Sequence, residues 1–439
     1  MIVPRTRLLI CLAAALPFLA AVPIFPGLTI VFVGFLALLL IVAILDALFS
    51  FRGLNGISVR LPDIVRLSKD REGEILLQVG NPSEKLREIR IGLPFPPEII
   101  PENESLPAIL PADSPGALLR WLCTPLKRGK YIFDKCYLET PSPVGLWSYR
   151  KSFPCESELR VYPNLSEERK KLAAIFLNRG GTGIHTQRLV GQGREFEKLR
   201  EYVPSDSYDQ IHWKATAKRG HPITKVFQVE RTQEVYVIID SSRLMAKESD
   251  SETILEQYVK SALILGLVAQ QQGDLFGLLT FNDRVNDFIR AGNGKAHYNA
   301  CRDALYTLQP QVVTPDYEEV CSFLRIRLRR RALLVFLTDL NDPILAESFV
   351  RSSQLIARQH LVLVNMIKPA TAKRLFSDAN AASIDSLYQK LGGHMLWQNL
   401  REIENVLHRQ GIRMTQLDQP KLSAELVTQY LAVKQRQIL

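Results

Sequence analysis

The sequence contains no pair of cysteines at the Cys-x-x-Cys spacing, and it has only six cysteines in 439 residues. They are scattered along the chain as Cys11, Cys123, Cys136, Cys155, Cys301 and Cys321. This pattern argues against a zinc site and suits a reducing compartment. Also missing is a run of Lys and Arg interleaved with aromatic residues, which disfavours nucleic-acid binding. The net charge of +10 instead favours an anionic partner such as a membrane surface.

Charged residues are absent from Leu8 to Leu45. A bilayer-spanning helix needs about 20 apolar residues, so this run is long enough for two spans. Because Pro23–Gly27 interrupts it, we expect one helix from about Arg7 to Val22 and a second from Leu28 to Phe51. Residues 1–52 are therefore predicted to form a transmembrane helical hairpin.

Arginines flank this hairpin, whereas its turn carries no charge. They are Arg5, Arg7, Arg52, Arg60 and Arg66. The positive-inside rule then predicts that both ends of the two-span hairpin, and so the soluble domains, face the cytoplasm. The alternative is a cleaved signal peptide ending near Ala20–Ala21, which would place the soluble part outside.

Residues 55–163 alternate apolar and polar residues in short runs separated by turn clusters rich in proline. The runs are Ile57–Leu61, Glu74–Val79, Leu86–Ile91, Ala117–Cys123, Tyr131–Leu138 and Glu158–Tyr162. Such spacing predicts an antiparallel, β-sandwich-like module. It contains no pattern typical of catalysis, so we expect a spacer or a binding surface.

A linker is expected at 164–230, and within it the segment 191–219 reads GQGREFEKLREYVPSDSYDQIHWKATAKR. No Gly-Lys-Ser/Thr follows its glycines and Gly191-x-Gly193 lacks a third glycine, so neither a P-loop nor a dinucleotide fingerprint is present. Glu195–Tyr202 is predicted to form a short amphipathic helix. Trp213 is expected to be a packing anchor in the polar loop that follows.

This segment resembles the signature of the bacterial family called "domain of unknown function 58". The matching residues are Gly191, Gly193, Glu195, Phe196, Leu199, Arg200, Tyr202, Asp206, Ile211, Trp213, Lys214 and Ala217. The chain departs from the family pattern at Ser205, Asp209 and Lys218. An upstream pair of motifs, Arg128-Gly129-x-Tyr131 and Pro143-x-Gly145-Leu146, is also similar to the family.

Residues 231–439 alternate apolar strands with amphipathic helices, which predicts a Rossmann-like, doubly wound parallel sheet. Asp240 follows the predicted strand Val235–Ile239, and Asp339 follows the strand Ala332–Leu337. Ligands bind at the carboxyl edge of such sheets. Carboxylates and hydroxyls gathered there would suit Mg²⁺.

The same region resembles a von Willebrand factor type A domain, whose metal site uses Asp-x-Ser-x-Ser, a Thr and a later Asp. The resemblance implies Asp240, Ser242, Thr314 and Asp339 as ligands, while Leu244 stands at the second Ser position. The alternative is that Asp240 caps its turn and Asp339 accepts from loop amides.

The resemblance implies a non-enzymatic, membrane-anchored scaffold that binds proteins at this edge, with a MoxR-class AAA+ ATPase as partner. A metal-dependent hydrolase at the same edge, with His212 as base, is the alternative. The arginine run between Arg325 and Arg331 either complements a helix C-terminus or contacts anionic lipid.

Overall fold

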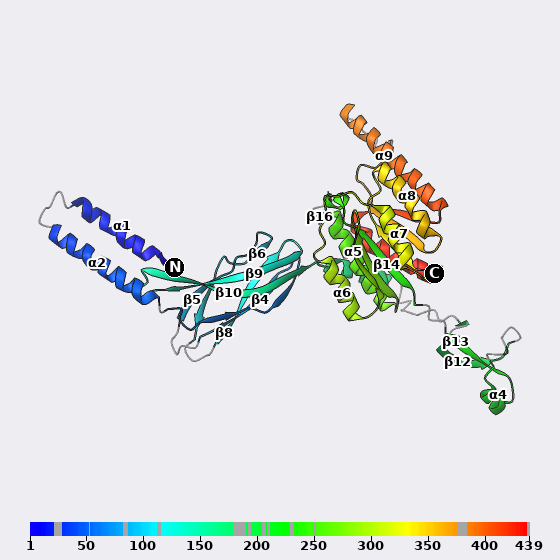
Figure 1. Cartoon of the computed structure of the whole chain (residues 1–439), viewed down its shortest axis with the longest axis horizontal. Coiled ribbons are helices and arrows are strands. Elements are labelled where there is room, and N and C mark those ends of the chain that lie inside the picture. The colour runs from blue at the N-terminus through cyan, green and yellow to red at the C-terminus, as the bar shows by residue number, and fades with distance from the viewer. Residues whose placement is uncertain are drawn as a thin grey trace. The chain divides into compact units, whose positions relative to one another are not determined.

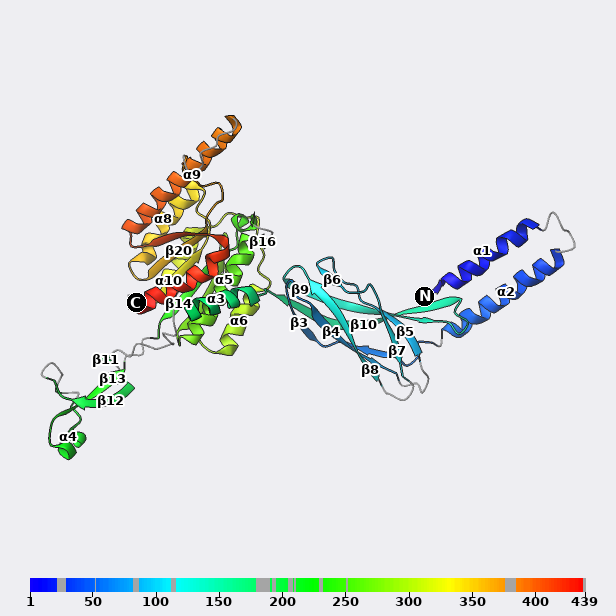
Figure 2. The same cartoon turned by 180° about the vertical axis from the view of Figure 1, so that it is seen from behind.

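A computed structural model describes the chain in segments that form two compact units, Met1–Asn164 and Leu165–Leu439 (Figures 1 and 2). The described residues are 1–21, 29–51, 53–81, 87–111, 116–178, 190–191, 195–203, 208, 211–228, 232–249, 252–375 and 384–436. The expected turn Pro23–Gly27 and the signature residues Gly193 and Asp206 lie outside these segments.

Two apolar helices open the first unit, α1 (Thr6–Ala21) and α2 (Thr29–Ser50), close to the predicted bounds. Within the described segments, one helix, Ile30–Ser50, is long and apolar enough to cross a membrane, and Thr6–Pro17 is a shorter apolar helix. By length and composition, the described residues thus include one candidate span. The second span and the orientation remain predictions.

The β-rich part of this unit consists of two sheets. One has the order β1 (Ile2–Pro4), β10 (Trp147–Tyr162), β9 (Gly129–Pro141), β5 (Arg87–Gly92) and β7 (Leu106–Leu110), with β3 (Ile64–Ser68) also paired to β10. The other has the order β2 (Ser58–Arg60), β4 (Gly73–Gly80), β8 (Gly116–Pro125) and β6 (Ile99–Pro101). Both sheets contribute to one apolar core, for example through Leu77, Trp121 and Leu159. The pairing is antiparallel as predicted, except that β10 and β3 run parallel.

Helix α2 is joined to the turn between β9 and β10 by a buried carboxylate. Asp46 is 3% exposed, and its Oδ2 accepts from Ser142 Oγ at 2.5 Å and from Leu146 N at 3.1 Å. Its Oδ1 accepts from Val144 N at 2.9 Å. The turn is the Pro143-x-Gly145-Leu146 motif noted in the sequence. These contacts, which we call the Asp46 clamp, fix the end of the helix to the sheet.

In the second unit, the signature segment forms strands and one short helix. Strand β12 (Glu195–Glu201) pairs with β13 (Ile223–Gln228), beside β11 (Val190–Gly191). The helix predicted at Glu195–Tyr202 is therefore wrong. The register shifts by a bulge between Phe196 and Lys198. Such a bulge interrupts strict alternation, so an apolar spacing of three fits a bulged strand as well as a helix.

The rest of this unit is a six-stranded sheet in the order β18 (Val285–Gly292), β17 (Leu275–Phe281), β14 (Glu234–Asp240), β19 (Leu333–Leu337), β20 (Leu361–Ile367) and β21 (Arg413–Leu417). All neighbours are parallel except β17 and β18. The continuous apolar strands are buried on both faces, as parallel strands usually are.

Helices form two groups around this sheet (Figure 1). One group is α3 (Ser166–Asn178), α5 (Ile254–Gln271), α6 (Lys295–Leu305) and α10 (Leu422–Arg436), and the other is α7 (Tyr317–Arg327), α8 (Pro343–Ala357) and α9 (Ile384–Arg409). Helix α3 places Leu172 in the core, so the unit begins inside the expected linker. Helix α9 begins earlier than the predicted Trp397.

Candidate functional site

The strand order reverses between β14 and β19. From β14 the chain proceeds to β17 and β18 on one side, and from β19 it proceeds to β20 and β21 on the other. The crevice at such a reversal is the usual ligand site of an open α/β sheet. Ile239 of β14 is in register with Leu337 of β19, so Asp240 and Asp339 follow at the same edge. We call this the carboxyl edge.

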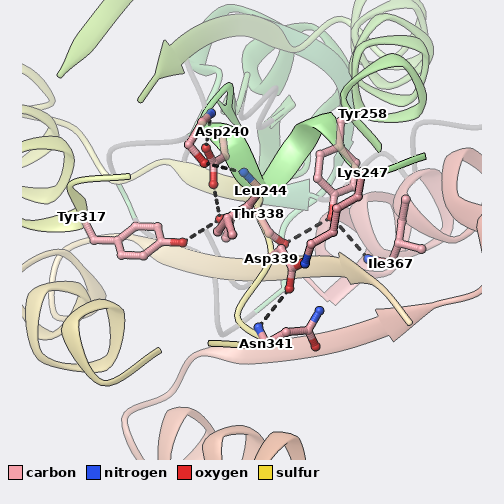
Figure 3. Close-up of polar contacts among 10 residues, drawn as sticks. Asp240, Leu244, Lys247, Tyr258, Tyr317, Thr338, Asp339, Asn341 and Ile367 are labelled. Atoms are coloured by element: carbon pink, nitrogen blue, oxygen red, sulfur yellow. Dashed lines mark hydrogen bonds and ion pairs between the residues drawn. The ribbon is translucent and has the colours of Figure 1, made fainter. Parts of the chain in front are cut away.

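Asp240 is fully buried and bonded to protein donors on both oxygens (Figure 3). Its Oδ1 accepts from Ser242 N at 2.8 Å, and its Oδ2 accepts from Thr338 Oγ1 at 2.7 Å. Since the only hydroxyl proton of Thr338 is used in this bond, Tyr317 donates its own to Thr338 Oγ1, over 2.8 Å. The result is a directed hydrogen-bond chain from Tyr317 through Thr338 to Asp240.

The pKa of Asp240 is raised from 3.8 to about 6. Burial is the main cause, the charge of Asp339 adds to it, and the hydrogen bonds from Ser242 and Thr338 oppose it. Tyr317 and Tyr258 are also buried, which raises their pKa values well above the usual 10.0, so both stay protonated donors. Tyr258 uses its hydroxyl to donate to Thr338 O at 3.2 Å.

Asp339 is paired with a lysine. Its Oδ2 lies 3.0 Å from Lys247 Nζ, and its Oδ1 accepts from Asn341 N at 2.9 Å (Figure 3). The carboxylate is buried, whereas the Lys247 side chain is half exposed and follows the short 3₁₀ helix Arg243–Ala246. The ammonium therefore supplies the positive charge beside Asp339.

The other predicted ligands are placed differently. Ser242 Oγ accepts from Leu244 N at 3.4 Å and so caps the 3₁₀ helix, while the Leu244 side chain is buried. Thr314 is exposed, and no bond to either acid is found within the described segments. Its loop borders the site, because Val313 O accepts from Arg243 N at 3.0 Å. The structure thus groups Asp240, Ser242 and Asp339, but not Thr314.

Two residues of this network were missed by sequence reasoning, Thr338 and Lys247. Thr338 directly precedes Asp339 at the end of a buried strand, so its position was a usable signal. Lys247 lies 92 residues from its partner, and no local pattern marks it.

The arrangement does not fit Mg²⁺. All four carboxylate oxygens of the two acids accept from a protein donor, and one of these donors is a cation. A divalent cation bound to Asp339 would lie close to the Lys247 ammonium, which is 3.0 Å from Oδ2 of this acid, and the two like charges would repel each other. Within the described segments, there is also no group of three or more His, Cys, Asp or Glu that could hold a metal. The contacts agree with the alternative to metal binding given in the sequence analysis, in which each acid accepts a hydrogen bond from an amide of its own loop.

We expect the wild-type chain to be insensitive to Mg²⁺ because Lys247 occupies the cation position. Replacing EDTA by millimolar Mg²⁺ should raise the free energy of unfolding by less than about 0.5 kcal/mol, measured by thermal melting in detergent. Lys247→Ala should increase this response, and Lys421→Ala, at an exposed lysine that is not paired with Asp339, should not. A Mg²⁺ stabilisation above about 1 kcal/mol in wild type would contradict the geometry.

The signature residues described by the structure lie away from any catalytic arrangement. His212 caps α4 (Trp213–Arg219), since its Nδ1 accepts from Ala215 N at 3.0 Å. No contact joins His212 to Asp240 or Asp339 within the described segments. Trp213 and Lys214 are exposed, so the expected packing role of Trp213 is not what the structure shows.

Comparison with known proteins confirms the family resemblance. Residues 198–378 match the family described as "Protein of unknown function DUF58". Uncharacterized proteins of Mycobacterium tuberculosis and Mycobacterium bovis are 25% identical to this chain over 183 residues, which is 41% of this chain and 57% of each relative. The match therefore spans little more than half the length of these relatives.

Among solved structures, an aerotolerance-related membrane protein from Bacteroides fragilis is 15% identical, with a TM-score of 0.30, covering 46% of this chain and 98% of that one. The conserved hypothetical protein BatB from Bacteroides thetaiotaomicron is 14% identical, with a TM-score of 0.30, covering 46% of this chain and 97% of that one.

Proposed function

We propose that this chain, whose residues 198–378 carry the DUF58 family domain, is a membrane-anchored, non-enzymatic adaptor that binds a protein partner at the carboxyl edge of its second unit. The observation that carries the proposal is a pair of exposed aliphatic side chains at that edge, one on a loop and one in the first turn of a helix. Val312 is 93% exposed and Ile344 is 78% exposed. Apolar anchors beside a polar centre are typical of protein interfaces.

The two anchors belong to segments that border the acids, Val312 to a loop and Ile344 to a helix. Val312 belongs to the loop whose Gln311 N donates to Ser241 O at 2.7 Å, next to Asp240. Ile344 lies in the first turn of α8, shortly after Asp339, and its N donates to Asp342 Oδ1 at 2.9 Å. A partner seated here would cover Val312 and Ile344 and would meet the half-exposed Lys247 beside Asp339.

The polar network supports binding rather than chemistry. Asp240, Ser242 and Thr338 are fully buried and bonded to one another, so none of these groups is presented to a substrate. The sheet order and the antiparallel edge strand β18 support a type A-like domain. In this chain the Lys247 ammonium would supply the positive charge beside Asp339 that a metal ion supplies in other type A domains. Partner binding at this edge would then not need a divalent cation.

A MoxR-class AAA+ ATPase is the candidate partner that the family resemblance implies. The arginines flanking the apolar helices support a location of the second unit in the cytoplasm, where such an ATPase would be accessible. The candidate span Ile30–Ser50 would tether the complex to the inner membrane.

The test is capture of the MoxR-class ATPase of the same organism by the detergent-solubilised full chain. Wild type is expected to bind it equally in EDTA and in Mg²⁺ with nucleotide held constant. The double variant Val312→Glu and Ile344→Glu should lose at least about tenfold in affinity, because two apolar anchors become charged. Ile326→Glu is the matched control at an exposed aliphatic residue on the opposite edge, and it should bind as wild type does.

Equal binding by the double variant and wild type would exclude the carboxyl edge as the docking surface. No binding by wild type would remove this ATPase as the partner. Binding that disappears in EDTA would contradict the proposed role of Lys247.

A further inference from the structure

The edge of the sheet opposite Asp240 and Asp339 is strongly basic. The strands β14, β19, β20 and β21 start there, and we call it the amino edge. Five arginines lie between the last turn of α7 and the start of β19, and others stand at the end of α8, the end of α9 and the start of β21. These exposed residues are Arg325, Arg327, Arg329, Arg330, Arg331, Arg358, Arg409 and Arg413.

Acidic residues are scarce around this cluster. The sequence has none from Val320 to Thr338. Val235 pairs with Leu333, so the preceding Glu234 lies next to the arginine run. The Glu234 carboxylate accepts a hydrogen bond from Tyr236 Oη at 3.2 Å. The charge of Arg331 contributes, after burial, to the lowered pKa of His360 behind it. The amino edge therefore carries a local excess of positive charge.

Complementing the helix dipoles accounts for only part of this excess. Arg325 and Arg327 lie in the last turn of α7, where a cation is favourable. Arg329, Arg330 and Arg331 lie beyond the helix, and the dipole effect falls off within the last turn. No ion pair joins these three to an acid in the part of the chain that the structure describes.

An exposed aliphatic residue stands within the basic run. Ile326 is 72% exposed between Arg325 and Arg327. A basic surface with an exposed apolar side chain suits an anionic bilayer, in which arginines contact lipid phosphates and the apolar side chain enters the interface. Nucleic acid is less suited, because the run offers no exposed aromatic residue on which bases could stack.

We propose that the amino edge of the second unit is a binding surface for anionic lipid headgroups, with Arg325, Arg329 and Arg330 as its main contacts and Ile326 as an insertion point. The same chain carries a helix, Ile30–Ser50, able to cross a membrane. Lipid binding here is independent of partner binding at the carboxyl edge, since the two surfaces lie at opposite ends of the strands.

The test separates this surface from the apolar helices. The full chain is held in a nanodisc of phosphatidylcholine. It is then offered separate vesicles of phosphatidylcholine, either pure or with roughly 30% phosphatidylglycerol, which gives the vesicle a negative surface potential. Wild type should bind the anionic vesicles and not the neutral ones. The binding should weaken steeply between 0.1 and 0.5 M salt, as screening requires.

The variant Arg325→Gln, Arg329→Gln and Arg330→Gln should lose roughly 100-fold in partition, at about fivefold per basic residue. The matched control, Arg243→Gln, Lys368→Gln and Lys421→Gln, removes three exposed cations from the carboxyl-edge side and should change partition by less than about threefold. Melting of both variants checks the fold.

Equal partition of the two triple variants would overturn the proposal, as would equal binding of wild type to neutral and anionic vesicles. Tighter binding of wild type to duplex DNA than to anionic vesicles, lost in the arginine variant, would reassign the surface to nucleic acid.

Discussion

Replacing Asp46 by alanine is expected to destabilise the junction between α2 and the turn of β9 and β10 by about 3–5 kcal/mol. The carboxylate is buried and accepts three hydrogen bonds, from Ser142 Oγ, Val144 N and Leu146 N. Alanine leaves the buried Leu146 amide and the partly buried Val144 amide without their acceptor, and an unpaired buried donor costs about 1–3 kcal/mol. Hydrogen exchange of residues 142–147 in detergent micelles measures the effect.

The exchange of this turn should become faster by two orders of magnitude or more, at about 1.4 kcal/mol per factor of ten. Asp46→Asn keeps one acceptor oxygen and should give an intermediate rate. Asp63→Ala, at an exposed aspartate of the same unit, is the control and should leave the turn as it is. Unchanged exchange in Asp46→Ala would show that the Asp46 clamp does not hold the turn.

The stability of the second unit is expected to fall as pH rises through the range 4 to 6, because of Asp240. Its pKa is raised from 3.8 to about 6, so the folded state binds the proton more tightly than the unfolded state does. The stabilisation is fully present below the unfolded pKa and is lost as pH rises through the folded pKa. The shift corresponds to about 3 kcal/mol, at about 1.4 kcal/mol per pH unit.

Comparison with Asp240→Asn isolates this contribution from other titrating groups. The free energy of unfolding of wild type minus that of the variant should decrease by about 2 kcal/mol between pH 4 and pH 7, because the unfolded carboxyl is already partly ionised at pH 4. Asp283→Asn, at an exposed aspartate, should show no such trend. A constant difference between wild type and Asp240→Asn would mean that the carboxyl group is already ionised at pH 4.

Much of the fold was predictable from local patterns. Apolar runs buried on both faces identified β14, β17, β19 and β20, and a long uncharged run identified α2. The segment Glu195–Tyr202 was assigned to a helix because Phe196 and Leu199 are three residues apart, and the bulge that allows this spacing in a strand depends on pairing with β13. Such pairing partners lie outside any local window.

The candidate site likewise has a part that local sequence patterns predict and a part that depends on the fold. Asp240 and Asp339 could be placed together because both follow buried strands, and parallel strands end at one edge. What the acids contact there could not be predicted, because Tyr317, Thr338 and Lys247 reach them from separate elements. The sequence already shows Leu244 at a position where the type A metal site has a serine. That Lys247 places a positive charge beside Asp339 can be seen only in the folded structure.

The Asp46 clamp also bears on the order of events during synthesis. Asp46 and Ser142 are 96 residues apart in the chain, and the Met1 amino group donates to Arg150 O across 149 residues. The Asp46 clamp cannot form until the ribosome has made the turn before β10, and the Met1 contact and the pairing of β1 must wait for β10 itself. Synthesis at about 5–20 residues per second leaves the apolar helices several seconds ahead of the sheet that receives them. Helix insertion therefore has time to precede closure of the sheet, and a pause in translation before β10 would lengthen that interval.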